Sequence, residues 1–371
     1  TLLASSAASD VYKRQEITLL RHLVSEEKEY ENPVTSLTSR RLRLNPEIRR
    51  MFKETTLSVE NFIAPIFVCF GENKKIPIKS MPNQYQISLD KLEDEILDLQ
   101  QHGISSVILF GIPEKKDFLG SDNFSDNGIV PSAIKLIKNK FPEMIVISDL
   151  CFCEYTDHGH CGIINMSENE FYQPNFEEGY LLNKETLKIL NDAALVHAKA
   201  GADIIAPSGM IDGTVGSIRT HLDINGFEKV AIMNYSVKYK SSLYEPFRDA
   251  ADSSPSFGDR SQYQMDSSNR REAVKKVKRD IDDGVDIIMV KPSMFYQDVI
   301  RELRDNFELP ICAYQVSGEY SMIHNAAANN LIDLEKAILE SLLSIKRSGA
   351  DLIITYFARE ISRTLNQNGD T

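Results

Sequence analysis

The sequence predicts a (β/α)₈ barrel, and three observations lead to that fold class. Eight short apolar segments rich in β-branched residues recur along the chain, helix-patterned segments separate most of them, and glycine marks several junctions. Nearly continuous apolar strands are typical of a parallel sheet that is covered on both faces. Eight such strands joined by crossover helices describe a closed α/β barrel.

The expected strands are seven or eight residues long and almost entirely apolar. They lie at residues 62–68, 105–111, 144–150, 202–208, 230–236, 286–292, 310–316 and 350–357. A doubly wound open sheet is the structural alternative, but the chain lacks the glycine fingerprint with which such folds bind nucleotides. The barrel is therefore the favoured architecture.

The connecting segments support this prediction. Apolar residues recur with a helical period over residues 89–102, 130–140, 184–200, 270–283 and 334–349. Gly201, Gly284 and Gly349 each follow one of these segments and precede the next strand. Glycine is favoured just past the end of a helix, because that position often has a left-handed backbone.

Three stretches stand apart from the repeat. Residues 1–15 show no apolar period and are expected to be a non-native or disordered leader, whereas residues 16–61 form an N-terminal arm that contains a basic segment at 38–50. The barrel itself is expected to span residues 62–371. Residues 241–268 follow the fifth strand and are too long for an ordinary loop, so we expect a lid, with surface disorder as the alternative.

Charge and composition exclude several classes of protein. The 371 residues carry a formal net charge of -12, which disfavours general nucleic-acid binding because phosphate contacts need clustered cations. No apolar run approaches the roughly 18 residues that cross a bilayer. Five cysteines, three of them crowded together, argue against a disulfide framework and for a reducing compartment. A cytoplasmic protein is expected.

Polar and reactive side chains gather where the predicted strands end. Active sites of such barrels lie at the C-terminal ends of the strands, so these residues are expected to share one rim. In strand order they are Asp149, Ser208, Lys238, Lys291, Tyr314 with Ser317, and Tyr356. Arg248, Arg260 and Gln264 lie in the expected lid, which is the main reason to prefer a lid over disorder.

The cysteine cluster follows the third strand directly. Cys151, Cys153 and Cys161 have the spacing Cys-x-Cys-x₇-Cys. Three thiolates suit zinc, and three protein ligands leave a fourth position for water or substrate, as in catalytic sites. The alternative is three buried thiols that pack as small hydrophobic groups. His158 and His160 lie in the same loop but are not expected to be ligands.

Two lysines end neighbouring strands. Lys291 closes an apolar strand, and a buried, unpaired ammonium tends to lose its proton. The neutral amine attacks ketones and forms a Schiff base. Lys238 ends the adjacent strand, and each amine is expected to depress the pKa of the other. Pattern alone leaves Lys240 as an alternative to Lys238. For either lysine, the alternative role is a structural salt bridge to a neighbouring carboxylate.

These segments together resemble the porphobilinogen synthase (5-aminolevulinate dehydratase) family of the zinc-dependent type. The resemblance rests on DLCFCEYTDHGHCG, APSGMIDG, NYSVKYKSS, PFRDAADSSPSFGDRSQYQM, IMVKPS, AYQVSGEY and SGADLIITYFA, which occur in order from about residue 40 to residue 365. It implies a hydro-lyase that condenses two 5-aminolevulinate molecules to porphobilinogen for heme biosynthesis. It also implies a homo-oligomer, commonly an octamer, held by the arm at 16–61.

The resemblance assigns roles to the candidate residues. Lys291 corresponds to the Schiff-base lysine of the first substrate and Lys238, not Lys240, to that of the second, while Asp149 corresponds to the active-site aspartate. The other implied roles are zinc ligation by Cys151, Cys153 and Cys161, carboxylate binding to one substrate by Arg248, Arg260 and Gln264, carboxylate binding to the other by Ser317 and Tyr356, and lining by Ser208 and Tyr314.

The chain departs from the family pattern at four places. Gly209 stands where an Asp is usual, Glu245 stands where a Gly is usual, and residues 163–183 form a longer stretch than usual. Lys276 replaces a Glu of magnesium-regulated members, so no allosteric Mg²⁺ is expected there. Two rival functions remain: a class I aldolase-like Schiff-base enzyme, and a zinc-bound family member that has lost activity through the changes at Gly209 and Glu245.

Overall fold

The computed structural model describes residues 39–367, and the chain divides into two compact units, Thr1–Glu54 and Thr55–Thr371. The described part of the first unit holds a short 3₁₀ helix, η1 (Ser39–Arg43), and helix α2 (Pro46–Met51). Asn45 caps α2, because its side-chain oxygen accepts a hydrogen bond from the Ile48 amide at 2.9 Å. The predicted leader and the first part of the predicted arm lie outside the described residues.

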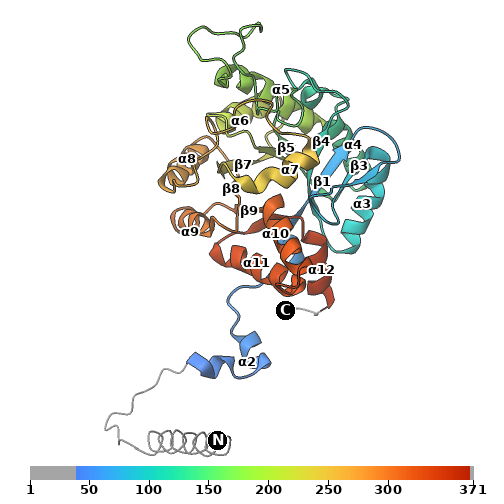
Figure 1. Ribbon diagram of the computed structural model, residues 1–371, viewed down its shortest axis with the longest axis vertical. Coiled ribbons are helices and arrows are strands. Elements are labelled where there is room, and N and C mark those ends of the chain that lie inside the picture. The colour runs from blue at the N-terminus through green and yellow to red at the C-terminus, as the bar shows by residue number, and fades with distance from the viewer. Residues whose placement is uncertain (1–38, 368–371) are drawn as a thin grey trace, which may run out of the picture. The chain divides into compact units, whose positions relative to one another are not determined.

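The second unit is a closed parallel barrel, as predicted (Figure 1). Neighbouring strands pair in parallel around the ring, and the last strand pairs with the first and closes it. All eight expected strands are present. They are β1 (Phe62–Cys69), β4 (Ser106–Ile112), β5 (Ile145–Leu150), β6 (Ile204–Pro207), β7 (Ala231–Lys238), β8 (Ile287–Lys291), β9 (Ile311–Gln315) and β10 (Leu352–Thr355).

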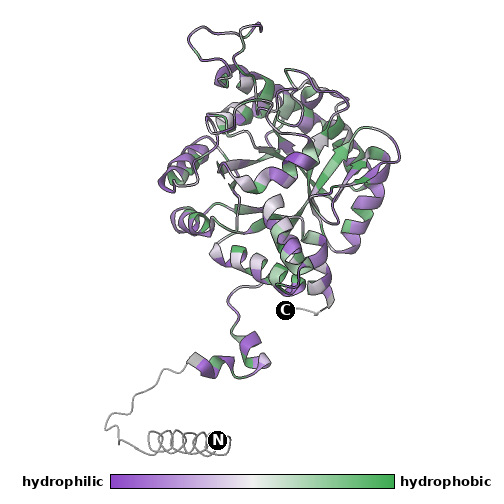
Figure 2. Ribbon diagram, viewed as in Figure 1, coloured by the Kyte–Doolittle hydropathy of each residue, from purple (hydrophilic) through white to green (hydrophobic). Residues whose placement is uncertain are grey.

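Helices surround the barrel and turn their apolar sides toward the strands (Figure 2). The five predicted helices are present as α3 (Leu89–Gln101), α4 (Ile129–Lys140), α5 (Asn183–Ala200), α8 (Arg271–Asp282) and α11 (Leu334–Ser348). Helices that were not predicted are α6 (Thr214–Ile224), α7 (Glu245–Ala251), α9 (Gln297–Asn306), α10 (Ser317–Ala328) and α12 (Ala358–Gln367). The additional helices complete the outer layer without changing the architecture.

The glycines predicted to end helices have the expected backbone. Gly201, Gly284 and Gly349 have φ angles of 107°, 90° and 123°. Side chains with a Cβ rarely adopt such angles, so glycine allows the chain to turn directly from helix into the next strand.

A hairpin outside the barrel was not predicted. Strand β2 (Lys75–Pro77) pairs antiparallel with β3 (Tyr85–Ser88), which continues the sheet beyond β1. Strand β2 is exposed along its length, so it lacks the apolar signal by which the barrel strands were recognised.

The predicted lid segment is ordered and bonded to the barrel. It begins with a 3₁₀ helix, η4 (Ser242–Tyr244), followed by α7. Near its end the Met265 amide donates to the Lys238 carbonyl at 3.0 Å, and the Lys240 amide donates to the Met265 carbonyl at 2.8 Å. Both ends of the segment are therefore fixed at the C-terminal end of β7.

Candidate active site

Strand pairing places two lysines side by side at the C-terminal rim of the barrel. Lys238 of β7 is paired in register with Lys291 of β8. The register shifts between Asn234 and Val237, which inserts one extra residue into β7 before the end of the strand. Both side chains are buried and line the same cavity, so the two amines face one pocket.

Lys291 is surrounded by aromatic rings. Its Nζ lies 4.1 Å from the ring centroid of Tyr314 and 5.1–5.3 Å from those of Tyr235, Tyr244 and Phe247. Burial lowers the pKa of Lys291 to about 7, and the charge of neighbouring Lys238 acts in the same direction. A substantial fraction of this amine is therefore neutral and nucleophilic near neutral pH.

Lys238 has different surroundings, and the expectation that its pKa is also depressed is wrong. Its Nζ donates to the Ser208 carbonyl at 2.7 Å. Burial lowers the pKa of Lys238, but the negative charges of Cys161 and the other two cysteine sulfurs outweigh burial and raise it above the ordinary value. The sequence placed the lysine correctly but gave no weight to the thiol cluster beside it.

Two carboxyl groups lie beside the lysines. Asp149 is buried and accepts a hydrogen bond from the Ser208 hydroxyl at 3.0 Å. Burial raises the pKa of Asp149 to about 7, with a further contribution from the charge of Glu154. Glu154 is itself only 2% exposed and accepts from the Cys153 thiol at 3.2 Å. Asp149 can thus exchange a proton near neutral pH.

The three predicted cysteines converge on one point. Their sulfurs lie within 4.8 Å of one another, with 3.4 Å between those of Cys151 and Cys153. Sulfurs around a tetrahedral zinc ion with Zn–S bonds of about 2.3 Å are about 3.8 Å apart, so the spacing fits. Burial raises the pKa of Cys151 well above its usual range, so three thiolates here need a cation to offset their charge. The geometry and chemistry of the cluster therefore fit a metal site.

The two histidines of the cysteine loop bond elsewhere. His158 Nε2 lies 3.2 Å from the Phe118 carbonyl, and burial lowers the pKa of this histidine to about 4. His160 contacts the Tyr263 hydroxyl through Nδ1 and the Phe257 carbonyl through Nε2, both at 3.1 Å. The two bonds of His160 join the cysteine loop to the lid segment.

The lid arginines reach the same cavity but are partly engaged. Arg260 is 4% exposed and donates to the Gly159 carbonyl at 2.9 Å. Arg248 forms a salt bridge with Glu245, the residue that replaces a glycine of the family pattern. A substrate carboxylate would therefore compete with Glu245 for the guanidinium of Arg248.

The predicted site residues divide between those that line this cavity and those that do not. The cavity is small, about 10 Å³, which is room for roughly one water. Among the predicted residues its lining comprises Asp149, Cys153, Ser208, Lys238, Arg248, Arg260 and Lys291. Those outside the lining are Cys151, Cys161, Gln264, Tyr314, Ser317 and Tyr356.

The residues outside the lining have specific contacts. The hydroxyls of Tyr314 and Tyr356 lie 3.0 Å apart, beneath Lys291. The Ser317 hydroxyl accepts from the Phe247 amide at 3.0 Å, so it is engaged with the lid helix α7. Gln264 is only 5% exposed, yet neither its side-chain oxygen nor its side-chain nitrogen has a hydrogen-bond partner among the described residues.

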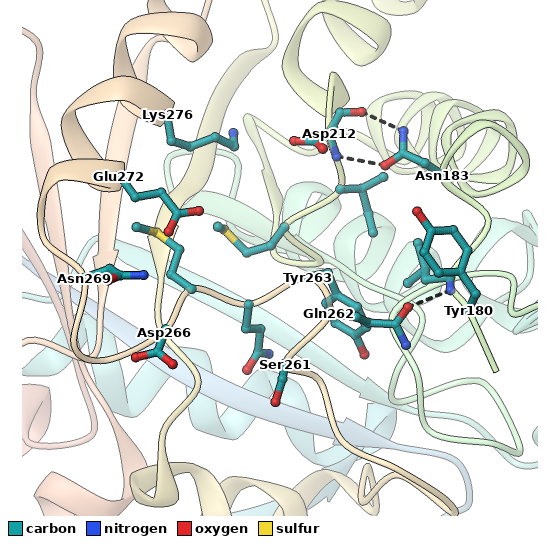
Figure 3. A pocket seen from close by; sticks show the side chains of 15 residues that line it. Tyr180, Asn183, Asp212, Ser261, Gln262, Tyr263, Asp266, Asn269, Glu272 and Lys276 are labelled. Atoms are coloured by element: carbon teal, nitrogen blue, oxygen red, sulfur yellow. Dashed lines mark hydrogen bonds between the residues drawn. The ribbon is translucent and has the colours of Figure 1, made fainter. Parts of the chain in front are cut away.

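Gln264 instead borders a second, larger cavity of about 370 Å³ behind the lid (Figure 3). Figure 3 shows Asp212, Asp266, Glu272 and Lys276 around this space. Lys276 is paired with Asp280 at 2.5 Å along α8. By the resemblance, Lys276 is the residue that replaces a Glu of magnesium-regulated members.

Comparison with known proteins identifies the family. The family model for delta-aminolevulinic acid dehydratase matches residues 36–364. The chain belongs to this family. It is 50% identical over 326 residues to the delta-aminolevulinic acid dehydratase of Bacillus subtilis, covering 88% of this chain and 97% of that protein. It is 52% identical over 322 residues to that of Methanothermus sociabilis, covering 87% and 96%.

A solved structure of the family has the same fold. It is the Toxoplasma gondii delta-aminolevulinic acid dehydratase (porphobilinogen synthase) in complex with the reaction product porphobilinogen. It superposes with a TM-score of 0.84 at 36% identity and covers 89% of this chain and 92% of that one. The barrel is thus the fold of the family.

Sequence reasoning missed part of the cavity wall. Phe110, Glu154, Tyr244 and Phe247 line the cavity beside the predicted residues. Glu154 could have been suspected, because it is a carboxylate directly after Cys153. The aromatic residues lie on β4 and the lid, and no spacing along the chain indicates that they line one cavity with Lys291.

Proposed function

We propose that the chain is a hydro-lyase that condenses two molecules of 5-aminolevulinate to porphobilinogen with loss of two waters. The observation that carries the proposal is the register pairing of Lys238 and Lys291, whose amines share one cavity beside three converging sulfurs. Two amines within one pocket can activate two keto acids and hold them within reach of each other. Family membership supports the same chemistry.

Each lysine activates one substrate as a Schiff base. The neutral amine adds to the ketone, water leaves, and the resulting iminium nitrogen withdraws electrons from the neighbouring carbon. That carbon loses a proton and attacks the other substrate, and the amino group of one substrate closes the ring. One C–C and one C–N bond form between the substrates, the two lysine–carbon bonds break and return both amines, and the two ketone oxygens have left as the two waters.

Asp149 and the lid supply the remaining functions. Asp149 lines the same cavity as both amines and has a pKa near neutrality, so it can take or return a proton during these steps. Arg248 and Arg260 bind one substrate carboxylate with Gln264, and Ser317 and Tyr356 bind the other. Closure of the segment 241–268 keeps bulk water from the iminium groups.

The metal of the cysteine site is proposed to be zinc. Cys151, Cys153 and Cys161 would hold it, since three soft, buried sulfurs suit Zn²⁺ and leave one coordination position open. Bound there, zinc supplies a Lewis acid that can polarise a carbonyl or activate a water. This chain's own residues carry the proton transfers and the covalent bonds.

Borohydride trapping tests the covalent chemistry. Reduction in the presence of 5-aminolevulinate should attach substrate irreversibly to Lys291, as read by mass spectrometry of the peptides. Product should form in a colorimetric porphobilinogen assay and stop when a zinc chelator is added. Trapping with other keto acids but no porphobilinogen would favour an aldolase-like enzyme, and a zinc-loaded chain that forms no product would favour an inactive member.

Assembly, regulation and location complete the proposal. The arm at 16–61 would hold a homo-oligomer, commonly an octamer, and light scattering of the full chain measures that state. No helix within residues 39–367 is long and apolar enough to cross a membrane. We expect a cytoplasmic enzyme without allosteric Mg²⁺, and activation by Mg²⁺ that disappears when Lys276 is changed would contradict this.

A further inference from the structure

We infer that Glu319 is a positioning residue that fixes the spacing between Lys291 and Ser317, and thereby selects the length of the keto acid that reaches Lys291. The inference rests on the proposed function, in which these two residues hold the ketone and the carboxylate of one substrate. Glu319 is fully buried at the start of α10 and touches neither proposed substrate anchor directly.

The carboxylate of Glu319 joins two loops that follow neighbouring strands. Its Oε1 accepts a hydrogen bond from the Met294 amide at 2.7 Å, and Oε2 accepts one from the Val316 amide at 2.8 Å. The Ser293 hydroxyl donates to Oε2 at 3.3 Å. Met294 lies three residues after Lys291, and Val316 immediately precedes Ser317. One side chain therefore connects the chain segments that carry both anchors.

The bond to Val316 alone would be ordinary helix capping, in which a glutamate in the first turn reaches back to the first amide. The bonds to Ser293 and Met294 are different, because they cross to the loop after β8 and contribute nothing to the cap. A buried carboxylate is costly, and burial raises the pKa of Glu319 to about 7. Three donors directed at the carboxylate offset that cost and hold it in one position.

The first turn of α10 in turn leaves little freedom to the lid. The Ser317 hydroxyl accepts from the Phe247 amide, and a Cβ added at Gly318 would lie 2.6 Å from the Leu243 carbonyl oxygen. Displacement of this turn would therefore move Ser317 away from Lys291 or push against the lid. The bonds of Glu319 to Ser293 and Met294 oppose that displacement.

The substitution Glu319→Gln removes one arm of this connection without changing size. Met294 and Val316 present N–H donors to different oxygens, so the amide nitrogen of glutamine would face one donor in either orientation. Glu319→Asp keeps both acceptors but is one methylene shorter, so it can reach both amides only if a loop moves. Both variants should relax the spacing between the anchors.

The test compares two keto acids that differ by one methylene. With 4-oxopentanoate and 5-oxohexanoate as probes, borohydride labelling of Lys291 is measured against probe concentration in the full chain. We expect the wild-type chain to prefer the shorter acid by about tenfold or more, the usual effect of one methylene in a fitted pocket. Glu319→Gln should lower that preference by at least about threefold, because the spacing is no longer fixed.

Asp286→Asn is the matched control. The Asp286 carboxylate accepts from the Ile232 amide at 2.7 Å and so joins β7 to the start of β8, at the opposite end of the strand. This variant makes the same carboxylate-to-amide change at another link between β7 and β8 but should keep the wild-type preference. A general loss of stability would change labelling of both probes together and leave their ratio unaltered.

Two outcomes separate this inference from the proposed function. A folded Glu319→Gln chain with the wild-type preference overturns the inference, and Glu319→Asp decides in the same way if the Gln variant does not fold. Absence of any label on Lys291 in the wild-type chain overturns the proposed function instead. Labelled Lys291 with a changed ratio only in the Glu319 variants supports both.

Discussion

The two lysines at the rim are neighbours in register but have opposite surroundings. Aromatic rings enclose the amine of Lys291, whereas Lys238 lies between the Ser208 carbonyl and the cysteine sulfurs. Burial dominates around Lys291 and lowers its pKa, while charge dominates around Lys238 and raises its pKa. The surrounding residues thus shift the pKa values of two identical side chains on adjacent strands in opposite directions.

The difference suggests how the two Schiff bases divide the work. Lys291 is reactive without any further partner, because desolvation alone favours the neutral amine. Thiolate charge on the three sulfurs favours the ammonium form of Lys238, and a bound divalent cation would offset that charge. The metal site and the second lysine are therefore expected to act as one unit.

Removing an amine should have the largest effect on this comparison. Lys291→Met should lower the rate of porphobilinogen formation by at least about 10³-fold, because no other group can form that Schiff base. Lys240→Met is the control, since Lys240 is exposed and pairs with Asp259. Equal losses in the two variants would mean that the wrong lysine has been assigned.

Loss of a metal ligand should have the next largest effect. Cys153→Ala should lower the rate of product formation by about 10²-fold or more. The variant should also lose its bound zinc, which atomic emission measures. Cys69→Ala serves for comparison, because Cys69 is a buried free thiol outside the cluster. Full activity of a zinc-free Cys153→Ala chain would separate the metal from the chemistry.

The pH dependence of labelling sharpens the contrast between the walls. The neutral fraction of an amine grows as pH rises through its pKa, and that of Lys291 is lowered from 10.5 to about 7. The trapping rate at Lys291 with 4-oxopentanoate should therefore rise about tenfold between pH 6 and pH 8 and then level off. A rate that continues to rise toward pH 10 would show an ordinary lysine.

Relief of the salt bridge at the lid should have the smallest effect. Glu245→Gln removes the partner of Arg248, so the guanidinium is free to bind a substrate carboxylate. We expect KM for 5-aminolevulinate to fall about two- to threefold with kcat unchanged, as suits an ion pair whose carboxylate is exposed to water. An increase in KM would instead assign Glu245 a role in holding Arg248 in place.

Periodicity was enough to predict the barrel, but it could not predict the walls of the site. Each expected strand is present, because strands covered on both faces produce apolar segments that are visible in the sequence. The rim residues followed from their place after those strands. Phe110 of β4 and the lid residues Tyr244 and Phe247 are more than 130 positions apart in the sequence, so only the folded structure shows that they line one cavity with Lys291.

Charge was the second quantity that the sequence did not provide. Two adjacent lysines suggested mutual depression of their pKa values, yet only Lys291 behaves in this way. The direction of the pKa shift at Lys238 depends on its distance from three sulfurs, which lie in the loop after β5. Such distances are set by packing and leave no trace in local composition.

The small volume between the amines has a consequence for selectivity in the cell. An amine that is partly neutral at physiological pH would condense with many aldehydes and ketones of metabolism. A space of about 10 Å³ admits none of them while the segment over the rim stays in place. We therefore expect that a compound must displace that cover to reach Lys291, and that a carboxylate, which Arg248 and Arg260 can attract, helps it to do so.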